Sequence, residues 1–377
     1  MGCETCPNKG CETRGQFALR FAQTAGVTMR PKGEFHGAPQ KRASRCARAM
    51  KGRLMEKFFS GKKILLIGGT GTIGTAILQK LLGYGVQAIR VFSRDEHKQF
   101  NLQREYPDKR LRFLLGDVRD YERVHRASEG IDAIFNLAAL KHVPACEYNP
   151  YEAVKTNVLG AQNVIQAAIA QNVGHVVLSS SDKAVSPTNA MGATKLLAER
   201  LISSAAHSKG TAKTRFCAVR FGNVMGSRGS VIPLFKEQIL KERRITLTNP
   251  DMTRFMMSSP DAASLTMEAL RNTRGGEVFV LKMPVIKMRD LADAVIGETC
   301  KKHGLSPGDV VIEDVGLRAG EKMYEELMTA EEAELAFDLG NMYMIAPQSL
   351  FGAYAAGGAG GAGNRAGSKT EGGAGNR

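Results

Sequence analysis

Two lysines, a carboxylic acid and several hydroxyl groups lie close together in the sequence. A short apolar run ends in Ser179-Ser180-Ser181-Asp182-Lys183, and a predicted helix then opens with Met191-Gly192-Ala193-Thr194-Lys195. Side chains of these types can exchange protons with a bound substrate if burial or a neighbouring charge adjusts their pKa values. The cluster therefore predicts an acid–base site, and the alternative is a solvated charged surface.

A glycine-rich turn, Gly68-Gly69-Thr70-Gly71-Thr72-Ile73-Gly74, lies between an apolar run and a predicted helix. Its glycines allow a tight turn and let the backbone approach a pyrophosphate, whose charge the N-terminus of the next helix stabilises. Glycine-rich turns are common, so the spacing alone is weak evidence. Because this turn opens a β–α–β unit, we predict a dinucleotide-binding site.

The residues after the second predicted strand bear on the choice of dinucleotide. An acidic residue at this place usually binds the ribose 2′-hydroxyl of NAD. Here Ser93 and Arg94 come first and suit the 2′-phosphate of NADP, while Asp95 follows them. The sequence therefore favours NADP and leaves NAD possible.

Short apolar runs alternate with amphipathic stretches through residues 56–349, which predicts one catalytic domain of repeated β–α units. Such units form a parallel sheet with helices on both faces, and ligands bind at the carboxyl ends of its strands. We expect an α/β fold, a Rossmann-type doubly wound parallel sheet with a smaller C-terminal substrate-binding lobe from about residue 222. The predicted strands are Lys62–Ile67, Ala88–Phe92, Leu111–Leu115, Ala133–Asn136, His175–Ser179 and Arg215–Arg220; the predicted helices include Thr72–Leu82, Asn157–Ala170 and Ala190–Ser204.

Two further strand ends contribute to the predicted dinucleotide site. Asp117 and Val118 follow the third strand, where Asp117 is expected to meet the adenine. Ala138 and Ala139 follow the fourth strand, where small side chains let the cofactor pass close to the chain. The predicted cofactor site therefore spans four neighbouring strand ends.

Taken together, these motifs resemble one family. The segments are GGTGTIG, FSRDE, GDVRD, NLAALKHVPACEYNP, TNVLGAQNV, SSSDKAVSPTNAMGATK, VRFGNVMGSRGSVIPLF, MTRFMM and GLRAGEKMYEEL. In this order they resemble the UDP-N-acetylglucosamine 4,6-dehydratases, the polysaccharide-biosynthesis branch of the extended short-chain dehydrogenases. The likeness covers roughly residues 60–347. The superfamily pattern Tyr-x-x-x-Lys is replaced here by Met191-x-x-x-Lys195, a variant found within this branch.

The resemblance implies a UDP-N-acetylhexosamine substrate and a three-step reaction. NADP+ takes a hydride from C4, water is eliminated across C5 and C6, and the hydride returns to C6. In this scheme Lys183 is the base for the C5 proton, Asp182 is the acid toward the C6 hydroxyl, and Ser181 is the hydroxyl partner in C4 oxidation. Lys195 holds the nicotinamide ribose. Met191 cannot move a proton, so its neighbours take over that task.

The resemblance also assigns residues on the substrate side. Lys141 follows the fourth strand and would contact the cofactor or a sugar phosphate, and Asn223 would contact the diphosphate. Arg254 and Arg318, the latter in a motif with Glu321, would form the uridine-diphosphate clamp, because a planar guanidinium binds phosphate with two donors. No metal ligand set is assigned.

The net charge of +15 is unevenly distributed along the 377 residues. About half of it lies in residues 1–55, and no basic stripe interleaved with aromatic residues is present, so we expect no nucleic-acid binding. No apolar run is long enough to span a membrane. The seven Cys residues do not suggest a disulfide framework. We therefore expect a cytoplasmic protein that does not enter the membrane. A homo-oligomer is a separate expectation.

Both ends of the chain differ from the middle. Residues 1–55 form a basic extension that is expected to be disordered, and residues 350–377 a Gly-rich tail with the same expectation. The first segment leaves three other interpretations open: a misassigned start before Met55, a targeting segment, or a weak metal site at Cys3, Cys6 and Cys11.

Two other functions share much of this sequence evidence. A UDP-sugar 4-epimerase would have the same fold, cofactor and first oxidation, but it needs no base at C5, so the cluster at Asp182 and Lys183 favours a dehydratase. A non-catalytic NADP-binding sensor or scaffold is the second alternative. The non-catalytic alternative is supported by Met191, which stands where the superfamily pattern has tyrosine.

Overall fold

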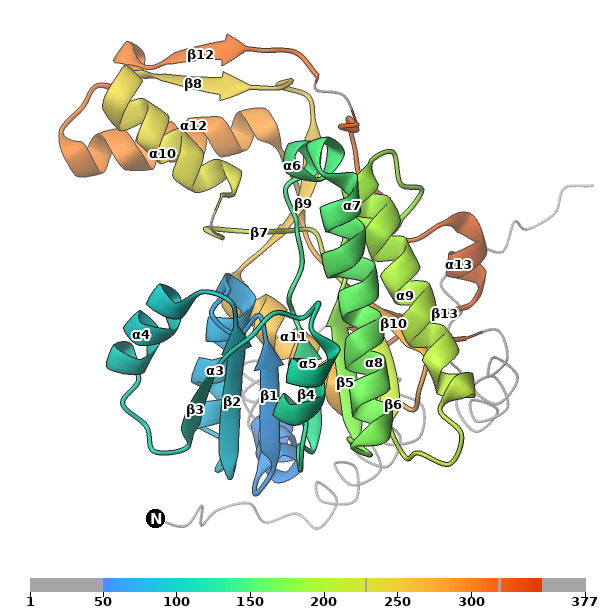
Figure 1. Cartoon of the computed structure of the whole chain (residues 1–377). Coiled ribbons are helices and arrows are strands. Elements are labelled where there is room, and N and C mark those ends of the chain that lie inside the picture. Colours follow the sequence, from blue (N-terminus) through green and yellow to red (C-terminus); the bar gives the residue numbers. More distant parts are fainter. Residues whose placement is uncertain (1–49, 228, 318–319, 348–377) are drawn as a thin grey trace, which may run out of the picture.

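A computed structural model describes residues 50–227, 229–317 and 320–347 (Figure 1). The expectations for residues 1–49 and 350–377, including the possible metal site and the disorder, fall outside these ranges, as does Arg318. Residues 50–59 are helical, and Met55 and Phe59 are buried in the core. The predicted domain boundary at residue 55 therefore lies inside a helix, because two apolar side chains one turn apart pack against the sheet.

The central sheet has nine strands in the order β13-β14-β10-β6-β5-β4-β1-β2-β3. All strands from β10 to β3 run parallel to their neighbours, whereas β14 and β13 are antiparallel additions at one edge. This order reverses direction at β1, as a doubly wound sheet requires. The strands are β1 Lys63–Ile67, β2 Ala88–Ser93, β3 Leu111–Leu115, β4 Ala133–Asn136, β5 His175–Ser179, β6 Arg215–Arg220, β10 Glu277–Leu281, β13 Ala336–Asp338 and β14 Met342–Ile345.

Helices cover both faces of this sheet because its strands are apolar on both sides. In β1, Ile64 and Leu66 belong to one apolar cluster, while Leu65 and Ile67 belong to the other, as the alternation of side chains along a strand dictates. The first face is covered by α3 Thr72–Leu82, α4 Glu96–Glu105 and α11 Ser259–Asn272; the second is covered by α5 Tyr121–Ala127, α8 Gly160–Ala170 and α9 Ala190–Ser208. The expected α/β fold is confirmed.

The helix predicted over Asn157–Ala170 is divided in the structure. A π-helix, η1 Val154–Leu159, leads into α8. The side chain of Asn157 accepts a hydrogen bond from the Leu140 N–H and donates to the Leu140 carbonyl and to Thr194 Oγ1. Asn157, within the wider π turn, thus connects the start of α8 through hydrogen bonds to the loop after β4 and to α9, near the predicted acid–base cluster. Such turns are frequent at functional sites.

A smaller lobe lies above the carboxyl ends of the strands (Figure 1). It packs helices α10 Val231–Glu242 and α12 Met288–His303 against the parallel pair β8 Arg244–Leu247 and β12 Val311–Asp314. The lobe predicted from about residue 222 is not continuous, because α11 and the wholly buried β10 return to the central sheet. The three-stranded sheet of β7 Asn223–Val224, β9 Thr253–Met257 and β11 Val285–Lys287 connects the two parts.

The remaining elements are short. They are α6 Val143–Tyr148, α7 Pro150–Ala153, the 3-10 turns η2 Asp182–Ala184 and η3 Pro307–Asp309, and α13 Ala330–Glu334. None of the helices in the described part of the chain is both long enough and apolar enough to cross a membrane.

Candidate active site

A pocket of about 570 Å³ lies at the carboxyl ends of β1, β2, β3 and β4. Of the residues predicted to bind the cofactor, Lys141 and Lys195 are not part of its lining, and Thr72, Ile73 and Gly74 instead form the first turn of α3. The predicted cofactor residues that line it are Gly68, Thr70, Gly71, Ser93, Arg94, Asp117, Val118, Ala138 and Ala139. The strand ends that the sequence analysis singled out therefore meet in one cavity.

The glycine turn is shaped for close backbone approach. Gly68 has a φ of +77°, and a Cβ there would lie 2.8 Å from the backbone nitrogen of Ala138. A Cβ at Gly74 would lie 2.6 Å from Gly69, so only glycine lets the turn fold onto the helix. Gly71 caps α3, whose first turn holds no acidic residue. This end of the pocket fits a dinucleotide pyrophosphate.

Charged side chains at the ends of β2 and β3 also line the pocket. Arg94 Nη1 lies 3.4 Å from Asp117 Oδ2, and 54% of the Arg94 side chain is exposed. Asp95 caps α4 by accepting a hydrogen bond from the Lys98 N–H, and it also pairs with the Lys98 ammonium. Burial raises the pKa of Asp117, but hydrogen bonds from Arg119 and the charge of Arg94 outweigh it, so this pKa lies below its usual value. Both carboxylates therefore already have cationic partners.

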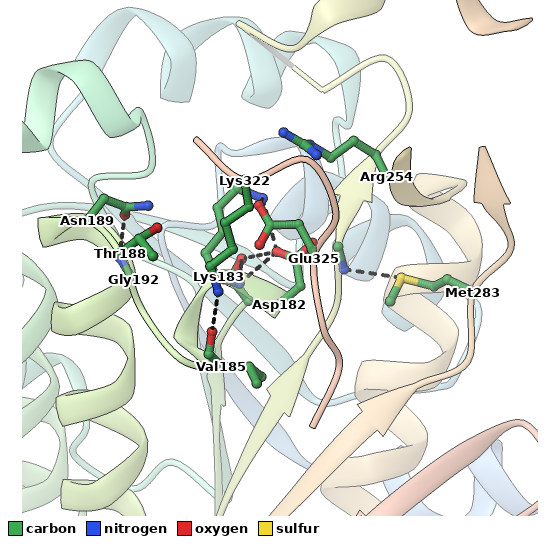
Figure 2. Close-up of polar contacts among 12 residues, drawn as sticks. Asp182, Lys183, Val185, Thr188, Asn189, Gly192, Arg254, Met283, Lys322 and Glu325 are labelled. Carbon is green, nitrogen blue, oxygen red and sulfur yellow. Dashed lines mark hydrogen bonds and ion pairs between the residues drawn. The ribbon is translucent and has the colours of Figure 1, made fainter. Parts of the chain in front are cut away.

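The acid–base cluster lies at the end of β5, where η2 begins (Figure 2). Asp182 is fully buried, and its Oδ1 accepts hydrogen bonds from Ser181 Oγ at 2.7 Å, from the Lys183 N–H at 2.9 Å and from Lys183 Nζ at 3.1 Å. Its Oδ2 is also buried and has no hydrogen-bond partner among the described residues. An unpartnered buried carboxylate oxygen is costly, and Oδ2 is the oxygen of Asp182 that keeps a free acceptor position.

A second carboxylate, which the sequence analysis missed, completes this cluster. Glu325 Oε1 lies 3.2 Å from Lys183 Nζ, and the Glu325 side chain is only 4% exposed (Figure 2). Glu325 belongs to the segment GLRAGEKMYEEL, in which only Arg318 and Glu321 were selected as site residues. Glu321 Oε2 is buried and unpartnered among the described residues. Sequence position alone gave no signal that Glu325 would reach Lys183.

Lys195 is the more deeply buried of the two lysines. Its Nζ donates to the backbone carbonyl of Ser179 at 2.8 Å, and the residue is 6% exposed. Burial lowers the pKa of Lys195 to about 8, although the charges of Glu199 and Cys146 act in the opposite direction. Met191, one helical turn before Lys195, is buried in a small apolar cluster with Cys146 and Ala153. It packs the site and offers no proton.

The predicted substrate residues lie in different surroundings. Arg254 is 8% exposed and uses one guanidinium nitrogen to donate to the backbone carbonyls of Thr253 and Met323. Asn223 starts β7 and pairs in register with Met256 of β9. Lys141 is exposed near the end of the loop that leads from β4 to α6. Figure 2 shows the guanidinium of Arg254 on the same side of the sheet end as Glu325 and Lys322.

Comparison with known proteins places this arrangement in a family. A family model described as polysaccharide biosynthesis protein matches residues 64–347. The chain belongs to this family. Its matched region includes the dinucleotide pocket, the cluster at the end of β5 and the C-terminal segment that carries Glu325.

Two relatives in this family are similar to the chain over most of its length. A Methanocaldococcus jannaschii protein, called an uncharacterized membrane protein, is 49% identical over 298 residues, which cover 79% of this chain and 90% of that protein. A Rickettsia bellii protein called UDP-glucose 4-epimerase is 44% identical over 291 residues, covering 76% of this chain and 83% of the relative.

Solved structures share the fold. The X-ray structure of Pen from Bacillus thuringiensis is 55% identical with a TM-score of 0.75, and the match covers 77% of this chain and 90% of that one. DesIV, a dTDP-glucose 4,6-dehydratase from Streptomyces venezuelae solved with NAD bound, has a TM-score of 0.63 over 76% of this chain and 92% of DesIV. Its identity is 23%, so this second likeness supports the fold alone.

In this family member, the pocket and the cluster are neighbours because β4 and β5 are neighbours. Asn136 at the end of β4 pairs in register with Leu178 of β5. Two residues after this pair, just beyond the ends of the two strands, Ala138 lines the pocket and Ser180 directly precedes the cluster at Ser181 and Asp182. Ser180 Oγ is buried without a partner among the described residues. A ligand extending from the pocket along this edge would therefore meet unpaired polar atoms.

Proposed function

We propose that this protein is an NADP-dependent UDP-N-acetylglucosamine 4,6-dehydratase that forms a UDP-4-keto-6-deoxy-hexosamine. One observation carries the proposal: buried Asp182 has one oxygen fully engaged and the other unpaired, and Lys183 lies beside it at a strand end next to the dinucleotide pocket. An acid and an amine at this place suit the removal of water from C5 and C6. A simple oxidation and reduction at C4 needs an acceptor for the C4 hydroxyl proton but gives the adjacent amine no proton to remove from C5.

The residues of the pocket fit a nicotinamide dinucleotide. Gly68 and Gly71 would accept the pyrophosphate, and Ser93 and Arg94 would contact the 2′-phosphate of NADP. When bound, such a cofactor supplies the redox chemistry, removing a hydride from C4 of the hexose and returning it to C6. The carboxylate of Asp95 already caps α4 and pairs with Lys98. Because it is engaged in these contacts, it is not arranged to bind the ribose 2′-hydroxyl of NAD, and this supports NADP over NAD.

Proton movement in this proposal uses the chain's own groups. The hydroxyl proton of C4 passes to Asp182 through Ser181, whose Oγ donates to Asp182 Oδ1 over 2.7 Å. Lys183, as a neutral amine, takes the proton from C5. Asp182 then gives its proton to the C6 hydroxyl, which leaves as water. Lys183 finally returns a proton to C5, so the substrate loses one water and both residues regain their starting states.

Binding of the uridine diphosphate would fall to residues above the cluster. We assign Arg254 and Asn223 to the diphosphate, because they lie on the small sheet that joins the core to the lobe. Lys195, whose burial lowers its pKa to about 8, would contact the nicotinamide ribose. Lys141 and Glu321 remain candidates for contacts with the sugar and its phosphates.

A UDP-sugar 4-epimerase is the second candidate. Rickettsia relatives that are 43–44% identical carry the name UDP-glucose 4-epimerase. An epimerase shares the oxidation at C4 but loses no water. The unpaired Asp182 Oδ2 and the adjacent Lys183 favour the dehydratase, since epimerisation at C4 gives a C5 base nothing to do.

Product analysis in deuterated water tests the proposal. Purified protein with NADP+ is incubated with UDP-N-acetylglucosamine and, separately, with UDP-glucose. We expect the first substrate to lose the mass of one water and to gain deuterium at C5, read by mass spectrometry and proton NMR. A product of unchanged mass with inverted C4 would establish the epimerase instead. Cofactor binding without turnover of either sugar would establish a sensor.

Single substitutions test the proposed roles of Asp182 as the acid and Lys183 as the base. Asp182→Asn and Lys183→Ala should bind NADP as the wild type does but form no dehydrated product. Asp293→Asn and Lys241→Ala are matched controls, because both residues form exposed ion pairs on the surface of the lobe. Wild-type turnover by Asp182→Asn and Lys183→Ala would refute the assignment, even if dehydration itself is observed.

A further inference from the structure

A segment from the far end of the chain lies across the acid–base cluster. We call residues 320–327 the strap. Asn189 Nδ2 donates to the carbonyl of Gly320 at 3.0 Å. Lys322 Nζ donates to the carbonyl of Ser186 at 2.7 Å and to the carbonyl of Val185 at 3.1 Å, and Figure 2 draws the bond to Val185. Its first part is thereby fixed to the loop that follows Lys183.

Other elements hold the rest of the strap. The Thr253 N–H of β9 donates to the carbonyl of Met323 at 2.9 Å. Arg220 Nη1, at the end of β6, donates to the carbonyl of Leu327 at 3.3 Å. Contacts from three separate parts of the fold thus fix the backbone on either side of Glu325. A carboxylate on such a support is pre-organised.

Glu325 uses this support to reach one partner. Its Oε1 lies 3.2 Å from Lys183 Nζ, on which Asp182 Oδ1 also converges at 3.1 Å. Glu325 is 8% exposed and Asp182 is fully buried, so bulk water does not compete freely for either contact. The flexible lysine stem, with several rotatable bonds, is therefore held at its nitrogen from two sides.

We propose that Glu325 is a positioning residue that holds the Lys183 nitrogen at C5 of the hexose. The inference rests on the proposed dehydration, in which Lys183 takes the C5 proton. Asp182 alone cannot fix the amine, because Asp182 must release and accept a proton during the same cycle. Glu325 undergoes no such change and keeps the nitrogen in place throughout.

The adjacent residue provides a matched control. Glu326 is exposed and forms no ion pair with any residue in the described ranges. Glu325→Gln and Glu326→Gln make the same chemical change at neighbouring positions of the strap. Glu325→Asp keeps the charge but shortens the side chain, so it should recover part of what Glu325→Gln loses.

The experiment compares these variants with the wild type on UDP-N-acetylglucosamine. We expect Glu325→Gln to lower kcat and the incorporation of deuterium at C5 by about 10- to 100-fold, the usual loss when a reacting group is misplaced by about an ångström. KM should change little. Because C4 oxidation precedes the impaired step, the near-ultraviolet absorbance of reduced nicotinamide should accumulate, which a general loss of structure would not produce.

A second measurement does not need turnover. Lys183 is labelled with an amine-selective reagent and quantified by peptide mass spectrometry, with NADP binding as the test of folding. Faster labelling of Lys183 in Glu325→Gln than in Glu326→Gln is expected, because one of its two anionic partners is gone. Equal labelling would overturn the inference whatever the enzyme's activity.

The outcomes separate the two proposals. Dehydration by wild type and equally by Glu325→Gln leaves the proposed function standing and overturns the role of Glu325. If the wild type forms no dehydrated product, the proposed function fails, and the role of Glu325 in C5 proton removal fails with it. A slow Glu325→Gln with accumulated reduced cofactor supports both.

Discussion

The ammonium of Lys195 donates its hydrogen bond to the backbone carbonyl of Ser179 at 2.8 Å, inside the fold and beside the acid–base cluster. Burial lowers the pKa of Lys195 to about 8 from its ordinary 10.5, despite the nearby Glu199. An amine that titrates near neutral pH changes the charge of the site within the range where enzymes work. It also links folding to pH.

The first prediction concerns stability between pH 8 and 10.5. In this window the unfolded chain keeps the Lys195 proton while the folded protein loses it, so the free energy of unfolding should rise with pH. The full gain is about 3 kcal/mol, from 1.36 kcal/mol per pKa unit. Below pH 8 the lysine is charged in both states and adds no pH dependence.

Urea denaturation of wild type and Lys195→Met across this range measures the effect. The difference in unfolding free energy between the two proteins should change with pH from 8 to 10.5, and it should be constant from pH 6 to 7.5, because other groups titrate equally in both. A difference that is independent of pH throughout would contradict a lowered pKa at Lys195.

The central sheet was predictable from sequence because local patterns determined it. Each strand is a short, mainly apolar run, such as residues 64–67, that ends at a glycine or a polar residue, and four of the six predicted strands have the bounds that the structure gives. The glycine turn was recognisable for the same reason. Its residues are adjacent in sequence, and steric demands at Gly68 and Gly74 exclude other side chains.

The parts that escaped prediction depend on contacts distant in sequence. Glu325 meets Lys183 only because β9, β6 and the loop after Lys183 together hold the strap. The lobe seemed continuous because nothing local marks β10 as a strand of the central sheet; its pairing with β6 decides that. The π turn around Asn157 similarly reflects bonds to Leu140 and Thr194.

The second prediction concerns the space in front of Asp182. A Cβ at Gly222 would lie 3.1 Å from Asp182 Oδ2 and 2.7 Å from the Phe255 carbonyl oxygen. Gly222→Ala should therefore crowd the unpaired oxygen and lower kcat by at least about tenfold, as misplacement of catalytic groups does. The control is Gly297→Ala in α12, where a Cβ meets no atom within 4 Å.

Steady-state kinetics and thermal melting separate the two glycine variants. Gly297→Ala should keep full activity and gain about 0.5–1 kcal/mol, because alanine is the better helix former. An active Gly222→Ala would show that Asp182 Oδ2 does not need this space.

The third prediction addresses cofactor choice. Arg94 is more than half exposed at the pocket edge, with Asp117 as its ion-pair partner at 3.4 Å. Arg94→Ala should weaken NADP binding by about 10- to 100-fold, because a charge-assisted hydrogen bond contributes about 1.5–3 kcal/mol, and it should leave NAD binding nearly unchanged. Calorimetric titration with both cofactors measures this difference. Arg104→Ala, on α4 outside the pocket lining, is the control. Equal loss for both cofactors would mean that Arg94 does not read the 2′-phosphate.

The last prediction concerns a buried charge network behind the site. Arg220 is 1% exposed, and its guanidinium forms paired hydrogen bonds with Glu199 of α9 and with Glu332 of α13. It therefore joins the helix of Lys195 to the segment that follows the strap. Removing the arginine would leave two carboxylates inside the protein without their cation.

Arg220→Met should lower the free energy of unfolding by about 3–5 kcal/mol, the usual cost of breaking a buried ion pair. Arg244→Met removes an arginine that also has two glutamate partners, Glu242 and Glu313, but its side chain is 47% exposed. That control should lose at most about 1 kcal/mol, because solvent screens surface pairs. Urea denaturation at pH 7 compares them. Equal losses in the two variants would mean that burial adds nothing to the Arg220 network.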